Sequence, residues 1–192
     1  IMCKRCKLVQ LDRNFDKKYL YGPDYGYRSG INKTMTKHLS SITNQMETLV
    51  SLKKNDHVLD IASNDGTLLN SYKKKNIIKV GIDPILKKYN NFYKKTHYKI
   101  PKFFSLKAIK NNKITNKFKI ITACAVFYDM ENPNKFLHDI SKIIEPNRGI
   151  FYLEFQDLLS IIKYNLFDTI CHEHLEYYSL KIVKKMLKNN DL

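Results

Sequence analysis

The sequence predicts a doubly wound α/β fold built on a mainly parallel sheet. Between residues 57 and 155, short apolar runs alternate with helical patterns, and this alternation favours parallel strands joined by right-handed crossovers. The 192 residues are 43% hydrophobic, which is enough for one main core, and no apolar run approaches the ~18 residues of a membrane span. We therefore expect a soluble, cytoplasmic protein without a membrane partner.

Each element is expected from its own pattern. Residues 33 to 52 place apolar side chains near a 3.6-residue period and predict an amphipathic helix. Buried strands and helices then alternate. The expected strands are residues 57 to 61, 77 to 82, 118 to 124 and 150 to 155, and the expected helices are residues 67 to 75, 85 to 93 and 132 to 144.

The net charge of +16, from 34 Lys and Arg against 18 Asp and Glu, raises the question of a nucleic-acid partner. Only four of these cations are arginines, although arginine is the side chain that favours bidentate recognition of phosphate and guanine. We therefore interpret the lysines as a solvated surface and expect no nucleic-acid partner. Selected binding of a polyanion is the alternative.

The four cysteines divide into a close pair and two isolated residues. Cys3 and Cys6 form a C-x-x-C knuckle, which supplies half of a tetrahedral zinc site. A redox pair and an incidental pair are the alternatives. Cys124 and Cys171 lie in apolar stretches, where we expect them to pack as small buried hydrophobes.

The turn after the first expected strand, DIASNDGT at residues 60 to 67, is the strongest functional signal. Its small residues let the backbone approach a ligand, but it is neither a phosphate loop nor a G-x-G-x-x-G dinucleotide loop. Asp60 and Asp83 end two strands, where a carboxylate can bind paired ribose hydroxyls. A ligand with an amino group and a ribose, such as S-adenosylmethionine, fits this pattern; another nucleoside-type cofactor and a purely structural turn are the alternatives. The expected cofactor-binding residues are Asp60, Ala62, Ser63, Asn64, Asp65, Gly66, Asp83, Pro84 and Ala123.

Several segments together resemble one known family. They are C-x-x-C-x-L-V-Q-L at residues 3 to 11, LYG at 20 to 22, YGYRSG at 25 to 30, VLDIASNDGTLL at 58 to 69, GIDP at 81 to 84 and FDTICHEH at 167 to 174. Through these segments the sequence resembles the sugar C-methyltransferases that carry an N-terminal zinc-binding domain and act on nucleotide-linked 4-keto-deoxy sugars.

The resemblance implies a class I, Rossmann-like fold that binds S-adenosylmethionine and zinc. It also implies a first cysteine pair before residue 1 and a further domain after residue 192, so we expect a fragment. On this basis residues 1–30 are a partial zinc knuckle with a Tyr-rich substrate segment, and residues 31–192 are the S-adenosylmethionine-binding methyltransferase domain. The sequence departs from the family at Ala62, usually glycine; at Cys171, commonly tyrosine; and at residues 127 to 130, where many members have a histidine.

The His-Glu-His element at residues 172 to 174 offers acid/base chemistry. It is not the H-E-x-x-H motif of zinc proteases, because Glu176 stands four residues after the first histidine. An imidazole suits a base that removes a proton beside a ketone, and a neighbouring carboxylate can orient it. A histidine pair bonded to the backbone and a metal site that includes Cys171 are the alternatives. The catalytic candidates are His172, Glu173 and His174, with Tyr25, Tyr27 and Tyr128 as donors to an enolate oxygen or as packing under the cofactor.

We therefore predict a C-methyltransferase that acts on a nucleoside-diphosphate-linked keto-deoxy sugar. His174, with Glu173, would remove the proton beside the ketone, and the enolate would take the methyl group of S-adenosylmethionine. An RNA methyltransferase is one alternative, favoured by the charge and disfavoured by the absence of an N/D-P-P-Y-type motif. A non-catalytic zinc-knuckle interaction module on a degenerate α/β scaffold is the other, disfavoured by the turn at residues 60 to 66. The oligomeric state is not indicated.

Overall fold

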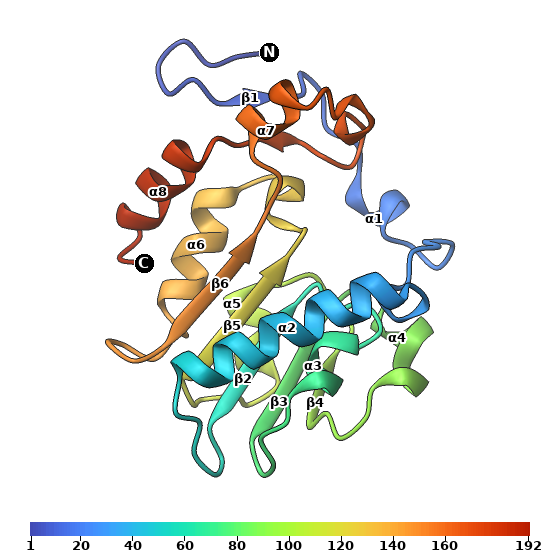
Figure 1. The fold of residues 1–192 in the computed structure, drawn as a ribbon, viewed down its shortest axis with the longest axis vertical. Coiled ribbons are helices and arrows are strands. Elements are labelled where there is room, and N and C mark those ends of the chain that lie inside the picture. The colour runs from blue at the N-terminus through green and yellow to red at the C-terminus, as the bar shows by residue number, and fades with distance from the viewer.

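The computed structural model describes residues 1–192 and has a five-stranded parallel sheet at its centre (Figure 1). The strand order is β4-β3-β2-β5-β6, and every neighbouring pair is parallel. Ile61 pairs with Ile82 on one side and with Ala123 on the other, so the three central strands end at the same level. The strands are β2 (His57–Ile61), β3 (Ile78–Ile82), β4 (Tyr98–Ile100), β5 (Phe118–Cys124) and β6 (Ile150–Glu154).

Eight α-helices accompany the sheet. The longest, α2 (Lys33–Leu49), begins at Asn32, whose side-chain oxygen accepts hydrogen bonds from the N–H groups of Thr34 and Met35 and so satisfies donors that a helix start leaves free. The others are α1 (Lys17–Leu20), α3 (Thr67–Ser71), α4 (Leu86–Tyr89), α5 (Leu106–Asn111), α6 (Pro133–Ser141), α7 (Leu158–Lys163) and α8 (Leu180–Lys188). No helix is long and apolar enough to cross a membrane.

The doubly wound parallel fold predicted from the sequence is confirmed, with differences in detail. The helix expected over residues 67 to 75 ends at Ser71, because the side chain of Glu47 accepts hydrogen bonds from the N–H groups of Lys73 and Lys74, which holds them in a non-helical turn. Between residues 57 and 155 the sequence patterns missed β4 and α5, which have three and six residues. Elements that short carry little periodic signal.

Hydrophobic side chains fill both faces of the sheet, as alternate strand residues point to opposite sides. On one face α2, α3 and α4 pack against the strands, and Figure 1 shows α2 and α3 in front of the sheet. On the other face α5, α6 and α8 contribute Ile109, Leu137 and Val183 to a second cluster. Each fully buried aliphatic side chain contributes about 1.5–3 kcal/mol, so these clusters hold the strand ends in fixed positions.

A second, two-stranded sheet joins the beginning of the chain to its last third. In it β1 (Val9–Gln10) runs antiparallel to β7 (Glu176–Tyr177), with Val9 opposite Tyr177. The N–H group of Leu11 donates to the carbonyl oxygen of Leu175 over 2.9 Å. This pairing brings the Tyr-rich segment, residues 19 to 30, and the His-Glu-His element to the same end of the molecule.

Candidate functional site

A cavity opens at the carboxyl ends of the sheet strands, where ligands of parallel α/β folds bind. Its walls come from the turn after β2, from the residues after β3 and β5, and from the Tyr-rich segment before α2. It is rich in carboxyl groups and has a single lysine. These side chains are Asp60, Asp83, Asp129, Glu131, Glu154 and Lys17.

Asp60, within β2, is buried at the base of this cavity with 4% of its surface exposed. One of its oxygens accepts a hydrogen bond from the hydroxyl of Thr122 at 2.6 Å. Burial raises the pKa of Asp60 to about 7, and the nearby charge of Asp83 adds to the effect. A cation bound in the cavity stabilises the ionised form, so Asp60 is suited to a positively charged ligand.

Asp83, directly after β3, has both oxygens on backbone donors. Oδ2 accepts from the N–H group of Asn64 and Oδ1 from that of Ile85, each at 2.9 Å. Burial raises the pKa of Asp83 to about 6, against the lowering effect of these two bonds. Each carboxylate oxygen has a second lone pair, so Asp83 can still accept two hydroxyl groups from a ligand.

The turn after β2 passes through the left-handed backbone region three times. The φ angle is 57° at Ala62, 50° at Asn64 and 75° at Gly66. This region costs a residue with a Cβ about 1–2 kcal/mol. Ala62 therefore occupies, at some cost in strain, the position where the family resemblance implies a glycine, and its methyl group lines the cavity.

Gly66 has no room for a side chain, and Gly66→Ala should lower the free energy of unfolding by about 2–4 kcal/mol. A Cβ there would lie 2.7 Å from Cδ1 of Tyr93, whose hydroxyl is fixed against Ser63 and the carbonyl oxygen of Asn64. Urea denaturation measures the loss. Gly26→Ala is the matched control, because its Cβ would meet nothing within 4 Å. Equal losses in the two variants would contradict this assignment.

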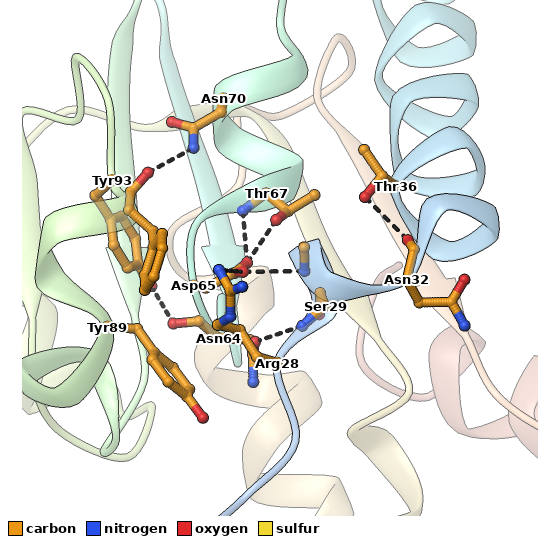
Figure 2. Close-up of polar contacts among 12 residues, drawn as sticks. Arg28, Ser29, Asn32, Thr36, Asn64, Asp65, Thr67, Asn70, Tyr89 and Tyr93 are labelled. Atoms are coloured by element: carbon orange, nitrogen blue, oxygen red, sulfur yellow. Dashed lines mark hydrogen bonds and ion pairs between the residues drawn. The ribbon is translucent and has the colours of Figure 1, made fainter.

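Asn64 ties the Tyr-rich segment to the turn (Figure 2). Its side-chain oxygen accepts from the N–H group of Ser29 at 2.9 Å, and its side-chain nitrogen donates to the carbonyl oxygen of Tyr27 at 3.1 Å. Asn64 also lines the cavity. The same residue therefore lines the cavity and is bonded to the segment that carries the tyrosines.

Asp65 continues this connection on the outer side of the turn. Its Oδ2 accepts from the N–H group of Gly30 at 3.0 Å and lies 3.5 Å from a guanidinium nitrogen of Arg28, which also stacks 4.1 Å from the ring centre of Phe92. Figure 2 shows Asp65 directed at this segment. Its other oxygen accepts from the backbone N–H group and the hydroxyl of Thr67. Both oxygens of Asp65 are therefore bonded to protein groups, and the residue does not line the cavity.

The cofactor-binding residues expected from the sequence fall into two groups in the structure. Six of them line the cavity: Asp60, Ala62, Ser63, Asn64, Asp83 and Pro84. Asp65 and Gly66 belong to the turn but do not line the cavity, and Ala123 is fully buried within β5. Beside Ala123, the next residues Cys124 and Ala125 form the wall instead.

Of the three tyrosines that the sequence suggested as donors, Tyr25 and Tyr27 line the cavity. Burial, with the charge of Glu173, raises the pKa of Tyr25, so its hydroxyl stays protonated and can donate a hydrogen bond. Tyr128 lies outside the wall, half-buried, with its ring 4.3 Å from that of His174.

Sequence reasoning missed several polar residues of the wall, among them Tyr21, Asp129 and Glu154. Glu154 is the last residue of β6, and its position at a strand's carboxyl end is the same signal that identified Asp60 and Asp83. Asp129 ends the short helix η3 (Phe127–Asp129) after β5 and is bonded to Tyr21. Only the folded chain brings that pair together.

The His-Glu-His element lies in the loop between the short helix η4 (Phe167–Thr169) and β7, and none of its three side chains lines the cavity. Nδ1 of His174 is 2.7 Å from the carbonyl oxygen of Thr169. Because a carbonyl only accepts, Nδ1 carries a hydrogen, and in the neutral imidazole the free lone pair is then on Nε2. His172 is exposed and packs edge-on against Phe15 at 4.6 Å. Glu173 acts on Tyr25 and Asp129 through its charge.

The cysteine knuckle is an exposed hairpin turn. Cys3 and Cys6 are both solvent-exposed thiols, and the turn closes through the N–H group of Lys7, which donates to the carbonyl oxygen of Cys3 at 2.9 Å. Backbone N–H groups of Cys6 and Arg5 lower the pKa of Cys3, which favours the thiolate that binds metals. No group of three or more metal-ligating side chains exists in the structure, so the two thiols fit only half of a tetrahedral site.

We expect residues 1–192 to bind zinc weakly, because two thiolates leave half of the coordination sphere to water. A zinc-loaded sample should lose its metal to a chelating dye, and Cys3→Ser should reduce even this binding. Cys171→Ser is the control. Stoichiometric zinc that resists the chelator would show that other groups of this chain complete the site.

The two isolated cysteines differ from expectation. Cys124 and Cys171 are half-buried rather than buried. Cys124 ends β5 and lines the cavity, where burial raises the pKa of its thiol. The apolar stretch around it is the end of a strand, and strand ends in this fold open onto the ligand site.

Comparison of the sequence with known proteins identifies a methyltransferase family and a C-methyltransferase relative. Residues 31–192 match the family described as "Methyltransferase domain". Over its whole length the chain is 24% identical to the C-methyltransferase NovU of Streptomyces niveus, of which it spans 46%. The chain thus covers about half the length of this curated relative.

Solved structures of methyltransferases share the fold at low sequence identity. The plantazolicin methyltransferase BamL, solved with a triazolic desmethylPZN analog and SAH, superimposes with a TM-score of 0.63 at 16% identity, over 82% of this chain and 63% of that one. A putative methyltransferase of Bacillus halodurans gives 0.57 at 18% identity, over 78% and 68% of the two chains. The family match covers most of the chain and includes the turn and acids at the ends of β2 and β3. The chain therefore belongs to the methyltransferase domain family.

Proposed function

We propose that this protein is an S-adenosylmethionine-dependent C-methyltransferase that acts on a nucleotide-linked keto-deoxy sugar. The observation that carries the proposal is the carboxyl-rich cavity in which Asp60 and Asp83 are buried beside a turn of small residues. S-adenosylmethionine has a positive sulfonium group, an ammonium group and a ribose, and each has a counterpart in this cavity. The similarity to the C-methyltransferase NovU supports carbon as the methyl acceptor.

The cofactor's two ends have different expected partners. Asp83 accepts the two ribose hydroxyls on its free lone pairs, while its backbone bonds to Asn64 and Ile85 hold the carboxylate in place. Asp60, within the neighbouring strand β2, faces the positive end. When bound, S-adenosylmethionine supplies an electrophilic methyl group.

In the proposed reaction His174 removes the proton from the carbon beside the ketone. Thr169 holds the imidazole through Nδ1 and leaves Nε2 to accept the proton. Because His174 lies outside the cavity wall, the keto sugar has to bind on the outer side of the tyrosines, between the cavity and this ring. Most of the rate acceleration comes from holding the enolate carbon about 3–3.5 Å from the methyl group.

The Tyr-rich segment, on this proposal, contacts the sugar. Tyr25 is held protonated by its surroundings and can donate to the enolate oxygen, with Tyr27 beside it. Residues 1–30 then form one functional segment, in which Cys3 and Cys6 contribute two ligands to a zinc site and the tyrosines contribute to substrate binding.

Mass spectrometry of the protein incubated with S-adenosylmethionine and a panel of nucleotide-linked keto-deoxy sugars tests the proposal. One sugar should gain a methyl group, 14 mass units, on carbon. The net charge of +16 favours one rival, RNA methylation, so a parallel reaction with total RNA and labelled S-adenosylmethionine is included. Label in RNA without any methylated sugar would replace the proposed substrate.

A further inference from the structure

Tyr21 and Asp129 form a hydrogen-bonded pair in the cavity wall. The hydroxyl of Tyr21 lies 2.8 Å from Oδ2 of Asp129, and both residues line the cavity. Tyr21 caps the end of α1, and Asp129 ends η3 after β5, so the pair joins the Tyr-rich segment to the sheet. Neither residue takes part in the reaction as described so far.

The other oxygen of Asp129, Oδ1, is buried without any hydrogen-bond partner. A buried ionised carboxylate with an empty acceptor is costly, whereas a carboxylic acid in the same place is not. The groups that act on Asp129 are the phenols Tyr21, Tyr25 and Tyr128 and the carboxyl groups of Glu173 and Glu176. None of them carries a positive charge, and the single lysine of the cavity wall, Lys17, is bonded to Glu131.

We propose that Tyr21 binds the carbonyl oxygen of the substrate and that Asp129 positions the hydroxyl of Tyr21. When Asp129 is uncharged, the phenol proton is free to bond to the substrate. A protonated Asp129 donates its own hydrogen to the phenol oxygen of Tyr21, so the phenol O–H can point at the substrate. An ionised Asp129 instead accepts a hydrogen bond from the phenol O–H, which then does not point at the substrate. This inference rests on the proposed enolate chemistry and adds Tyr21 to Tyr25 as a second donor to the enolate oxygen.

The titration of Asp129 gives this arrangement a pH dependence. Burial raises the pKa of Asp129 to about 8, the charge of Glu173 adds to this, and the bond from Tyr21 opposes it. The carboxyl group is therefore protonated below about pH 8, and the donor form of Tyr21 is lost as the pH rises through that value. A carboxylic acid kept neutral by its site is an established way to supply hydrogen bonds to an enolate.

Kinetics on the keto sugar found in the mass-spectrometric panel test the inference. Tyr21→Phe should lower kcat by about 100-fold to 1,000-fold, the effect of removing one donor to a developing oxyanion, with unchanged affinity for S-adenosylmethionine. Asp129→Asn should keep most of the activity and abolish the loss of rate above pH 8, because the amide donates to Tyr21 at every pH. Tyr19→Phe is the matched control, as Tyr19 lies on the same helix α1 and is 89% exposed.

The possible outcomes separate the two proposals. If no keto sugar is methylated by the wild-type protein, the proposed function fails and this inference fails with it. If the sugar is methylated and Tyr21→Phe matches Tyr19→Phe, only the role of Tyr21 is overturned. If Asp129→Asn loses as much rate as Tyr21→Phe, the ionised carboxylate is the required form. If Asp129→Asn still loses rate above pH 8, another group causes that loss. Either result overturns the positioning role of Asp129.

Discussion

Replacing His174 with alanine is expected to lower turnover of the keto sugar by about 100-fold to 10,000-fold, the usual contribution of a positioned acid/base group. The affinity for S-adenosylmethionine should stay nearly unchanged, because His174 lies outside the cavity, with its Nδ1 bonded to Thr169 and its ring packed on that of Tyr128. Steady-state kinetics and calorimetry measure the two effects separately. His138→Ala is the control, since His138 is exposed on α6.

Isotope exchange tests the same residue at the proton-transfer step. With S-adenosylhomocysteine in place of the methyl donor, the wild-type protein should introduce solvent deuterium at the carbon beside the ketone, and the His174→Ala protein should not. Exchange that persists in this variant but disappears in a His172 or tyrosine variant would assign the base elsewhere within the same reaction class.

Asp83→Ala should weaken S-adenosylmethionine binding by at least about 100-fold, since two hydrogen bonds to a charged acceptor are worth about 1.5–3 kcal/mol each. The variant also leaves the N–H groups of Asn64 and Ile85 without their acceptor, which loosens the turn. Calorimetric titration with the cofactor measures the loss.

Asp56→Ala is the matched control for Asp83. Asp56 also accepts a backbone hydrogen bond, from Lys53 at 2.7 Å, but at the opposite end of β2. Its removal costs a similar turn contact without touching the cavity. If the two variants bind S-adenosylmethionine equally well, Asp83 has no role at the ribose.

Much of the site was visible in the sequence, because strand ends and tight turns leave local signatures. The run from Asp60 to Gly66 could be located by its small residues. In the structure, Ala62, Asn64 and Gly66 occupy the positions where the backbone is left-handed. Asp83 could be predicted as a site residue because it comes at the end of the next strand. The expectation that Asp65 faces the cofactor had no such support, because the direction of a side chain in an irregular turn depends on its neighbours, here Gly30 and Arg28.

The sequence by itself determined the parallel α/β fold and the place of the turn at residues 60 to 67, since apolar periodicity and turn residues act over short stretches of chain. Only the tertiary structure decided what surrounds that turn. Two contacts join residues far apart in the chain, the pairing of β1 with β7 and the bond from Tyr21 to Asp129. The tertiary structure also places His174 outside the cavity wall. Such contacts come from packing and burial, which no local pattern records. Burial also raises the pKa of Asp129.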